Sequence, residues 1–354
     1  MKDKMQLKFA LICFLLIQVW GLSPFTLHAK EKTTLLVTGG AGFIGSNFVE
    51  HMFETHSDYH IIVLDVLTYS ANVENIPKHI RNSPRFSLIQ GSICDEELIN
   101  QLMANSDFVV HFAAESDVTR SIVDDRIFYE TNVMGTRNLL HHLVKYRDSV
   151  KRFIHISSSE VYGTCEDEEL TEESVLSPRS PYAASKVGAE ASVFAYGCTY
   201  DLPVAILRFF NNYGPRQHPE KVVAKFIIYA LKDLPIPVHG TGEQSRDWVY
   251  VKDTARAIDA ALHVSDFETI RNQIINCGTG RDISIATIAK TICRSEGVPL
   301  ERVVFTADRP GQVQKHLSST AKAKKLLGWE PLTSFEQGIE TTLNWYRNNP
   351  MVPK

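Results

Sequence analysis

The sequence has few cysteines and no closely spaced pair of them. Six are spread over 354 residues, and no two form a Cys-x-x-Cys motif. A disulfide framework and a zinc site are therefore not indicated, and we predict buried, reduced thiols and no bound metal. The chain also lacks internal repeats and low-complexity segments, so no repeat architecture is expected.

An excess of charge of one sign is also missing. The 37 Lys and Arg residues face 41 Asp and Glu residues, which gives a formal net charge of −4 at pH 7. The two signs are interspersed along the chain, so there is no reason to expect a nucleic-acid partner. With 44% hydrophobic and 22% charged residues, the composition is that of a globular protein. Its length allows one large α/β domain or two lobes.

The apolar run at residues 9–20 is too short to span a bilayer comfortably. Three lysines precede it, and the pattern resembles a secretory signal peptide or a short membrane anchor. We leave residues 1–31 out of the fold as a signal-like or anchor-like segment. Membrane association through residues 9–22 is one outcome, and a dispensable extension on a cytoplasmic protein is the other.

From residue 33 to about 159, short apolar runs alternate with helix-like segments. This alternation predicts an α/β fold with a doubly wound parallel sheet. The expected strands are Thr34–Val37, His60–Leu64, Phe86–Ile89, Phe108–Phe112, Arg152–Ile156 and Val204–Arg208. The expected helices include Asp95–Met103, Thr131–Tyr146 and Ala183–Tyr200.

The second half of the chain loses this rhythm. We predict a loop at 211–217, short extended segments at 235–238 and 247–251, and helices at 222–231, 285–296 and 334–348. The alternating part forms one predicted domain, residues 32–208 and about 246–276. The rest, about 209–245 and 277–350, forms a smaller C-terminal lobe that closes over a substrate.

A glycine-rich turn follows the first expected strand and leads into a helix-like segment. Its sequence is Thr38-Gly39-Gly40-Ala41-Gly42-Phe43-Ile44-Gly45. Gly39 allows a tight turn, Gly42 lets a pyrophosphate approach the helix N-terminus, and Gly45 lets the helix lie close to the strand. Strand, glycine turn and helix in this order are the context in which such a motif binds a dinucleotide. We place Phe43 and Ile44 at the same ligand.

Asp65 ends the second expected strand, twenty residues after the turn. At this position a carboxylate accepts hydrogen bonds from the adenosine ribose and favours NAD over NADP. Residues that follow the third strand would flank the adenine, and residues that follow the fourth would pass close to the cofactor. These are Ser92, Ile93, Ala113 and Ala114.

Tyr182 and Lys186 are four residues apart on an expected helix and so share one face. An ammonium group near a phenol stabilises the phenolate, so we expect the pKa of Tyr182 to fall toward neutrality. Such a tyrosine can take a proton from a sugar hydroxyl while hydride leaves the same carbon. Ser158, at the end of the fifth strand, can place a hydroxyl beside it.

These motifs together resemble the extended short-chain dehydrogenase/reductases that act on nucleotide sugars, and most of all the dTDP-glucose 4,6-dehydratases and their close relatives. The resemblance covers about residues 33 to 348. It rests on the segments TGGAGFIGSN, AAESDVTRSI, ETNVMGT, SSSEVYG, SPYAASK, NNYGPRQHPEK, RDWVYVKD and DRPGQ. Members of this family commonly dimerise through the helix that carries the Tyr-Lys pair and the helix before it, here about 183–200 and 131–146.

The resemblance implies an NAD-dependent lyase with a three-stage reaction on a nucleotide-diphosphate sugar. Tyr182 deprotonates the C4 hydroxyl as NAD accepts the C4 hydride; the C5 proton and the C6 hydroxyl leave as water; and the hydride returns to C6. Lys186 and Ser158 assist Tyr182, and Glu160 is the expected base for C5. The implied substrate contacts are Ser116, Asn212, Lys221, Arg246 and Arg309.

Ser159 departs from the family pattern. The dTDP-glucose enzymes typically carry Thr-Asp-Glu where this chain has Ser158-Ser159-Glu160, and the aspartate serves as acid for the leaving hydroxyl. A serine does not replace it at similar pKa. GDP-mannose 4,6-dehydratases also have serine before the glutamate, so Glu160 can shuttle the proton. UDP-glucuronate decarboxylases have Thr-Ser-Glu, and they hold the C5 carboxylate with an arginine. Ser92 also departs, because aspartate is usual there.

Three alternatives therefore stay open beside the 4,6-dehydratase. A UDP-glucuronate decarboxylase and a nucleotide-sugar 4-epimerase share its first step. A non-catalytic NAD-binding protein would share the fold, but would not require Ser158, Tyr182 and Lys186 together. The expected location is the cytoplasm, where NAD and nucleotide sugars are found.

Overall fold

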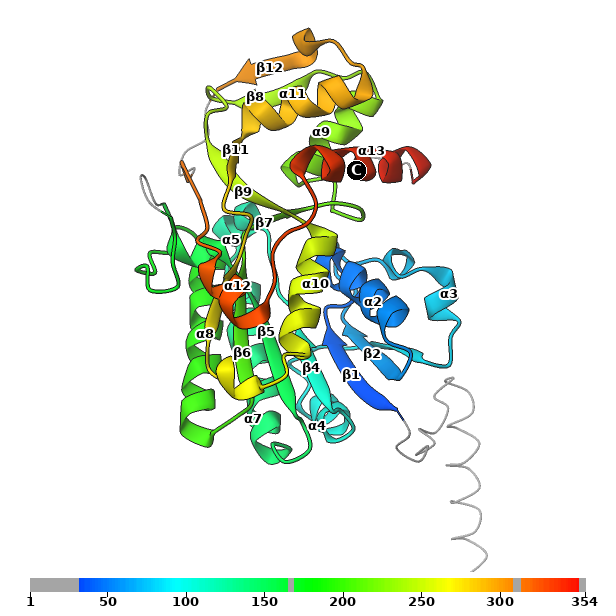
Figure 1. The fold of residues 1–354 in the computed structure, drawn as a ribbon, viewed down its shortest axis with the longest axis vertical. Coiled ribbons are helices and arrows are strands. Elements are labelled where there is room, and N and C mark those ends of the chain that lie inside the picture. Colours follow the sequence, from blue (N-terminus) through cyan, green and yellow to red (C-terminus); the bar gives the residue numbers. More distant parts are fainter. Residues whose placement is uncertain (1–31, 165–168, 308–312, 350–354) are drawn as a thin grey trace, which may run out of the picture. The chain divides into compact units, whose positions relative to one another are not determined.

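The central sheet has seven parallel strands in the described part of the chain, in the order β10-β6-β5-β4-β1-β2-β3 (Figure 1). The computed structural model describes residues 32–164, 169–307 and 313–349. The strands are β1 (Thr33–Thr38), β2 (Tyr59–Asp65), β3 (Phe86–Gln90), β4 (Phe108–His111), β5 (Arg152–Ser158), β6 (Val204–Phe209) and β10 (Ile274–Cys277). The prediction of a doubly wound parallel sheet is confirmed. β10 was not predicted.

Helices cover both faces of this sheet (Figure 1). On one face, α2 (Phe43–Thr55), α10 (Val251–Leu262) and α12 (Ala321–Leu327) pack on a core that includes Phe48, Val63 and Ile258. On the other face, α4 (Glu96–Ala104), α7 (Thr136–Lys145) and α8 (Pro181–Tyr200) pack on a core that includes Leu139 and Val193. Burial on both faces explains why β1 has a continuous apolar run rather than an alternating one.

A third core lies beyond the carboxyl ends of the strands, at the top of Figure 1. It joins α9 (Val222–Leu231), α11 (Ile285–Glu296) and α13 (Phe335–Asn348) with the parallel pair β8 (Ile236–His239) and β12 (Val303–Thr306). A three-stranded sheet, β11 (Asp282–Ser284), β9 (Ser245–Tyr250) and β7 (Asn211–Tyr213), links it to the first part. The smaller predicted lobe thus has its own core.

Shorter elements complete the chain. They are η1 (Val73–Asn75), α3 (Lys78–Arg81), α5 (Val118–Val123), α6 (Arg126–Phe128), η2 (Tyr129–Gly135), η3 (Ser159–Tyr162), η4 (Phe267–Thr269) and η5 (Leu300–Arg302). The helix predicted at Thr131–Tyr146 is in fact two segments, because η2 is π-helical and α7 begins only at Thr136. Gly135 lets this turn pack on Ile93: a β-carbon there would lie 2.5 Å from Cδ1 of Ile93.

The prediction of a loop at 211–217 is wrong at its start. Asn211, Asn212 and Tyr213 form β7, which pairs in parallel with β9. The side chains of the two asparagines are polar, and that of Asn212 bonds Phe210 and Thr254, whereas only Tyr213 packs in a core. The sequence therefore did not indicate a strand. The domain boundaries stay a prediction, although α12, expected in the second lobe, packs against the sheet with Ala323 and Trp329.

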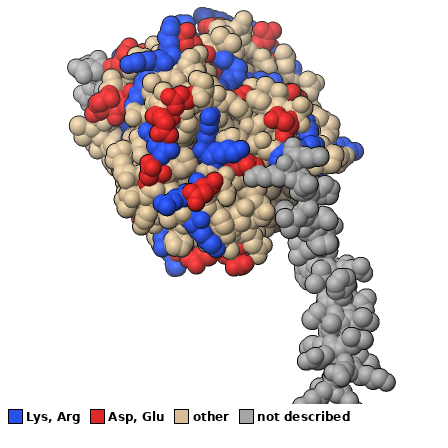
Figure 2. Space-filling view, turned by 60° about the horizontal axis from the view of Figure 1, so that its bottom comes forward, with Lys and Arg blue, Asp and Glu red and all other residues tan. Residues whose placement is uncertain are grey.

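The surface agrees with the balanced composition. On the face drawn in Figure 2, basic and acidic side chains are interspersed. No helix in the described ranges is long and apolar enough to cross a membrane, and the predicted segment 1–31 lies outside them. The prediction of buried thiols is wrong for Cys94 and Cys198, which are exposed, whereas Cys277 and Cys293 are buried. Cys13 and Cys165 are not among the described residues.

Candidate active site

A cleft of about 320 Å³ lies at the carboxyl ends of the first five strands, within the size range of small-molecule sites. It lies where the sheet order reverses between β1 and β4, the usual place for a ligand in an open α/β sheet. Every residue predicted to bind the cofactor lines it, as do the predicted substrate residues Ser116 and Lys221. The cofactor set is Gly39, Gly42, Phe43, Ile44, Gly45, Asp65, Ser92, Ile93, Ala113, Ala114, Tyr182 and Lys186.

The glycine turn has the geometry that its sequence requires. Gly39 has a φ of +72°, which side chains rarely allow, and a β-carbon there would lie 2.7 Å from the nitrogen of Ala113. A β-carbon on Gly45 would lie 2.3 Å from the oxygen of Gly39. Gly42 is different, because its φ of −75° suits any residue and its β-carbon would meet only the Gly39 oxygen, at 3.3 Å. The protein's own packing thus hardly requires glycine at 42, which leaves close approach of a ligand as the reason.

Asp65 joins the glycine turn to the end of β2. Its carboxylate accepts hydrogen bonds from the main-chain N–H of Ala41 at 2.9 Å and of Leu67 at 2.8 Å. Burial raises the pKa of Asp65, and these two hydrogen bonds oppose the rise. Each carboxylate oxygen keeps a second lone pair, so Asp65 can still accept from a ligand hydroxyl at the cleft.

Two buried polar atoms in the cleft wall find no hydrogen-bond partner among the described residues. They are the hydroxyl oxygen of Ser157 and the side-chain oxygen of Gln217. A buried polar atom without a partner costs free energy, so both atoms are suited to a polar ligand in the cleft. The sequence reasoning missed both: Ser157 was noted only within its serine run, and Gln217 only within a loop.

Tyr182 and Ser158 come together at the end of β5. Ser158 closes the strand and caps η3 by accepting from the N–H of Glu160 at 3.2 Å. Tyr182 stands in the first turn of α8, which begins at a cap formed by Ser180 with a proline next to it. Burial raises the pKa of Tyr182 to about 12, a hydrogen bond with Ser158 lowers it, and the charge of Glu160 raises it. Three of the predicted catalytic side chains, those of Ser158, Glu160 and Tyr182, are therefore neighbours.

The expectation of a lowered tyrosine pKa is wrong for this structure. Lys186 turns its ammonium group to the main-chain oxygen of Ile156, at 2.7 Å, rather than to the phenol. It is itself buried, and burial lowers its pKa to about 8 while the charge of Glu190 opposes this. Sharing one helix face places the two residues in the same cleft, but the pKa of each is set first by its own burial.

Glu160 belongs to a cluster of polar side chains, some of which come from the second half of the chain. Burial lowers the pKa of Arg246, and the Glu160 carboxylate opposes this shift. Glu160 and Arg246 both act on His316, whose pKa is lowered, first by burial. Nδ1 of His316 lies 3.5 Å from the hydroxyl of Ser159, and its Nε2 bonds to the oxygen of Gly163. His316 thus adjoins the serine that departs from the family pattern; a lone histidine outside the recognised motifs gave no signal for this.

The remaining predicted substrate residues differ in their placement. Lys221 lies 3.7 Å from Asp117 and 3.6 Å from Glu220 at the cleft edge. Both polar side-chain atoms of Asn212 are used internally, one as donor to Phe210 at 2.9 Å and the other with Thr254. Neither Asn212 nor Arg246 belongs to the cleft lining, and the same is true of Ser158 and Glu160. Arg309 lies outside the described residues.

Comparison with known proteins places the chain in a family. Residues 36–342 match the family described as GDP-mannose 4,6 dehydratase. The low-salt glycan biosynthesis protein Agl12 of Haloferax volcanii is 41% identical over 88% of this chain and 98% of its own length. The trifunctional UDP-glucose 4,6-dehydratase, 3,5-epimerase and reductase RHM2 of Arabidopsis thaliana is 37% identical over 90% of this chain, which spans only 48% of that protein.

A solved structure gives the same result. The dTDP-glucose 4,6-dehydratase DesIV of Streptomyces venezuelae, crystallised with NAD and TYD, is 39% identical, with a TM-score of 0.84 over 90% of this chain and 98% of its own. The protein belongs to the GDP-mannose 4,6 dehydratase family. The resemblance stated from the sequence is thereby confirmed, together with the predicted class of activity, an NAD-dependent nucleotide-sugar 4,6-dehydratase.

Proposed function

We propose that Ser158, Glu160, Tyr182 and Lys186 carry out the 4,6-dehydration of a nucleotide-activated hexose in this cleft. The observation that carries the proposal is that Tyr182 lines the same cleft as the glycine turn and is hydrogen-bonded to Ser158, with the charge of Glu160 acting on it. NAD, bound along that turn, supplies the hydride acceptor for C4 and the hydride donor for C6. The net change is the loss of one water, which gives a 4-keto-6-deoxy sugar.

Tyr182 is the proposed base for the C4 hydroxyl. Its proton is held by burial, and the Ser158 hydrogen bond is the contact that favours the phenolate. Ser158 thus orients the phenol and stabilises its charged form when a substrate hydroxyl approaches. Lys186 lies on the same helix face, and its low pKa of about 8 lets it exchange a proton near neutrality.

Glu160 is the proposed base for C5, because oxidation at C4 acidifies that carbon and a carboxylate then suffices as base. It is also the group that can return the proton to the departing C6 hydroxyl, since Ser159 cannot supply one at neutral pH. Arg246 adjoins Glu160. The family resemblance assigns Arg246 and Arg309 to the diphosphate, with Asn212 and Lys221 as further contacts, and that assignment stays part of the proposal.

The cluster of polar side chains around Glu160 also favours one alternative function, decarboxylation. Ser159 in place of an acid, with Arg246 beside Glu160, is also the set expected of a UDP-glucuronate decarboxylase, in which an arginine holds the C5 carboxylate. Incubation of the full chain with dTDP-glucose, UDP-glucose, UDP-GlcNAc, GDP-mannose and UDP-glucuronate separates the possibilities by product mass. Loss of water from a hexose supports the dehydratase, and loss of carbon dioxide replaces it with the decarboxylase. An isomer of unchanged mass indicates an epimerase. No turnover, with NAD still bound, leaves a binding protein.

The proposal includes a homodimer, formed through α8 and the segment before it. Large apolar side chains are exposed there, among them Met134 on η2 and Phe194 on α8, whose side chains have exposed fractions of 56% and 48%. Exposed apolar side chains of this size mark association surfaces when they cluster. Light scattering should give the mass of a dimer for the wild type and of a monomer for Phe194→Glu. A wild-type monomer would refute the dimer.

The proposed location is the cytoplasm, with membrane contact through residues 9–22. Both parts rest on the sequence alone. Fractionation of cells that express the full chain, or a chain beginning at residue 32, tests them: membrane association should depend on the N-terminal segment.

A further inference from the structure

Three histidines and one aspartate converge at the junction of α2 and α10, far from the cleft. His51 lies in α2, His56 ends it, Asp259 lies in the last turn of α10, and His263 ends that helix. The nearest strand residue is Tyr59, the first of β2, whereas Asp65, the last of β2, faces the cleft. Six residue steps along a strand correspond to about 20 Å. The group is therefore not part of the proposed active site.

Two imidazoles face one carboxylate oxygen. Oδ1 of Asp259 lies 3.0 Å from Nε2 of His56 and 2.6 Å from Nδ1 of His263. One ligand atom from each of these three residues lies within 4.8 Å of the others. A tetrahedral zinc ion with bonds of about 2.0–2.1 Å holds its ligand atoms about 3.3 Å apart. Small side-chain movements suffice to seat an ion among the three atoms.

Two neighbouring residues bond the second oxygen of Asp259 and the second ring nitrogen of His263. Nε2 of His51 bonds Oδ2 of Asp259 at 2.7 Å, and the hydroxyl of Tyr59 bonds Nε2 of His263 at 2.8 Å. Metal-ligating histidines commonly bond through the other ring nitrogen, which fixes the tautomer and turns the free lone pair to the metal. His51 and Tyr59 are placed to do this for Asp259 and His263.

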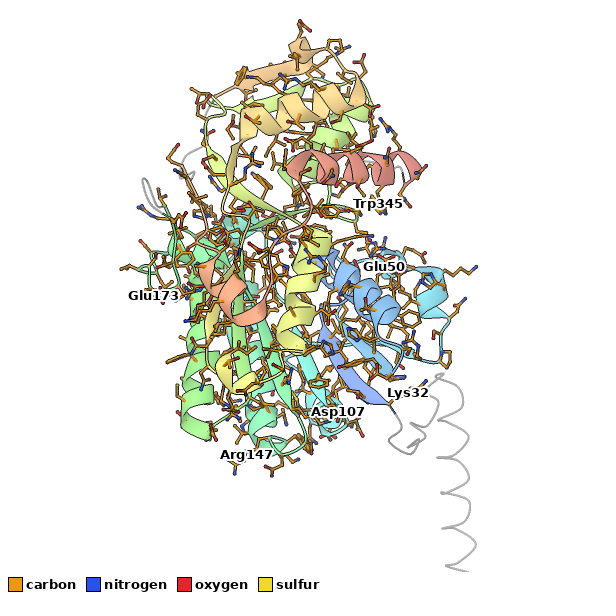
Figure 3. All side chains as sticks on the ribbon, viewed as in Figure 1. Lys32, Glu50, Asp107, Arg147, Glu173 and Trp345 are labelled. Atoms are coloured by element: carbon orange, nitrogen blue, oxygen red, sulfur yellow. The ribbon has the colours of Figure 1, made fainter. Side chains whose placement is uncertain are left out.

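The electrostatic setting favours a cation. α2 and α10 end at His56 and His263. Arg85 donates hydrogen bonds to the last main-chain oxygens of α2, and Arg152 donates to that of Leu262, so the two helix C-termini are already neutralised. The negative charge at the cluster is therefore the carboxylate of Asp259. Carboxylates of Asp58 and Asp107 also act on the Tyr59 hydroxyl, opposed by the guanidinium of Arg152. Figure 3 shows Asp107 at this same end of the sheet, away from the second lobe. His263 is exposed, which leaves a path for an ion from solvent.

We propose that His56, Asp259 and His263 bind a first-row divalent metal ion, with Zn²⁺ as the physiological candidate, and that His51 and Tyr59 position two of these ligands. Two imidazoles and a carboxylate are the ligand set that such ions prefer, and water completes the tetrahedron. The ion would clamp the C-terminal end of α2, the helix that begins at the glycine turn, to α10. This is a structural role and does not depend on the proposed function.

Metal binding to the untagged full chain tests the proposal directly. After chelation and dialysis, titration with Co²⁺ and Zn²⁺ should give one saturable site per chain with a visible Co²⁺ spectrum, and Zn²⁺ should raise the melting temperature. His56→Asn and His263→Asn should each weaken binding at least tenfold. His141→Asn, an exposed histidine on α7, is the matched control and should bind as the wild type does.

A second measurement needs no variant, which matters if the substituted proteins fold poorly. Zn²⁺ should protect His56 and His263 from acylation by diethyl pyrocarbonate, read by mass spectrometry, and leave His141 reactive. The proposal is overturned if no saturable site is found, if binding survives both substitutions, or if Zn²⁺ gives no protection. The cluster would then be a set of proton-mediated hydrogen bonds around Asp259.

Discussion

The ammonium nitrogen of Lys186 donates a hydrogen bond of 2.7 Å to the main-chain oxygen of Ile156. Burial lowers the pKa of this lysine to about 8 in the folded protein, whereas an unfolded lysine titrates near ~10.4. Between these values the folded protein binds fewer protons than the unfolded chain. The free energy of unfolding must therefore rise with pH across this window and be independent of this group below it.

We expect the titration of Lys186 to contribute up to ~3 kcal/mol to this rise. Lys186→Met removes the titration, so its free energy of unfolding should depend less steeply on pH between about 8 and 10. Urea unfolding of both proteins at several pH values measures the slopes. Lys145→Met, an exposed lysine on α7, should keep the wild-type slope. Equal slopes for Lys186→Met and wild type would contradict the lowered pKa.

Alanine at Gly45 should mainly reduce the stability of the fold, whereas alanine at Gly42 should mainly reduce the affinity for NAD. The Gly45 β-carbon would overlap the oxygen of Gly39 at 2.3 Å, so Gly45→Ala should lower the free energy of unfolding by at least ~2 kcal/mol. Gly42→Ala meets the same oxygen only at 3.3 Å and should cost less than ~1 kcal/mol. It should nevertheless reduce NAD affinity at least tenfold. Thermal unfolding and NAD titration measure the two effects; an unchanged affinity would remove Gly42 from the cofactor site.

Loss of the Tyr182 hydroxyl should stop oxidation at C4. Tyr182→Phe should lower kcat by about 10²–10⁴-fold, the usual contribution of a general base. Ser158→Ala should have a smaller effect in the same direction, because it removes the hydrogen bond that favours the phenolate. Tyr196→Phe changes a tyrosine farther along α8 and serves as the control. Similar rates for Tyr182→Phe and Tyr196→Phe would exclude Tyr182 as the base.

Glu160→Gln should separate the stages of the reaction. Without a base at C5, elimination should fall about 10²–10⁴-fold, while C4 oxidation continues and reduced cofactor accumulates in a rapid absorbance trace. Glu173→Gln alters an exposed glutamate and should leave both stages intact (Figure 3). If Glu160→Gln loses oxidation and elimination equally, Glu160 is not the C5 base.

Local sequence signals were enough for the glycine turn, for Asp65 and for the position of Tyr182. The glycine turn follows an apolar run and Asp65 ends one, whereas Tyr182 was found by its spacing of four residues from Lys186. The βα repetition fixes which strand ends meet. β10 was missed because Ile274–Cys277 is only four residues long and sits outside that repetition. The pKa of Tyr182 could not be predicted, because it depends on burial and on where the Lys186 side chain turns.

Long-range contacts gave no local signal at all. His316 reaches Ser159 across 157 residues, and Asp259 reaches His51 across 208. No spacing rule connects such residues before the fold is known. The sequence therefore predicted residues that line one cleft, predicted the neighbourhood of Glu160 only in part, and did not predict the histidine cluster on α2 and α10.

The late position of α10 and β10 in the chain affects how the protein is made. β1 to β6 are complete by residue 209, but the helix that covers their face with α2 ends at Leu262, and the edge strand β10 ends at Cys277. A nascent chain that stops between the end of β6 and the start of α10 exposes the apolar side chains that α10 would cover. Truncation there should yield aggregates rather than a folded cofactor domain. We therefore expect that the first six strands do not form a folding unit without α10 and β10.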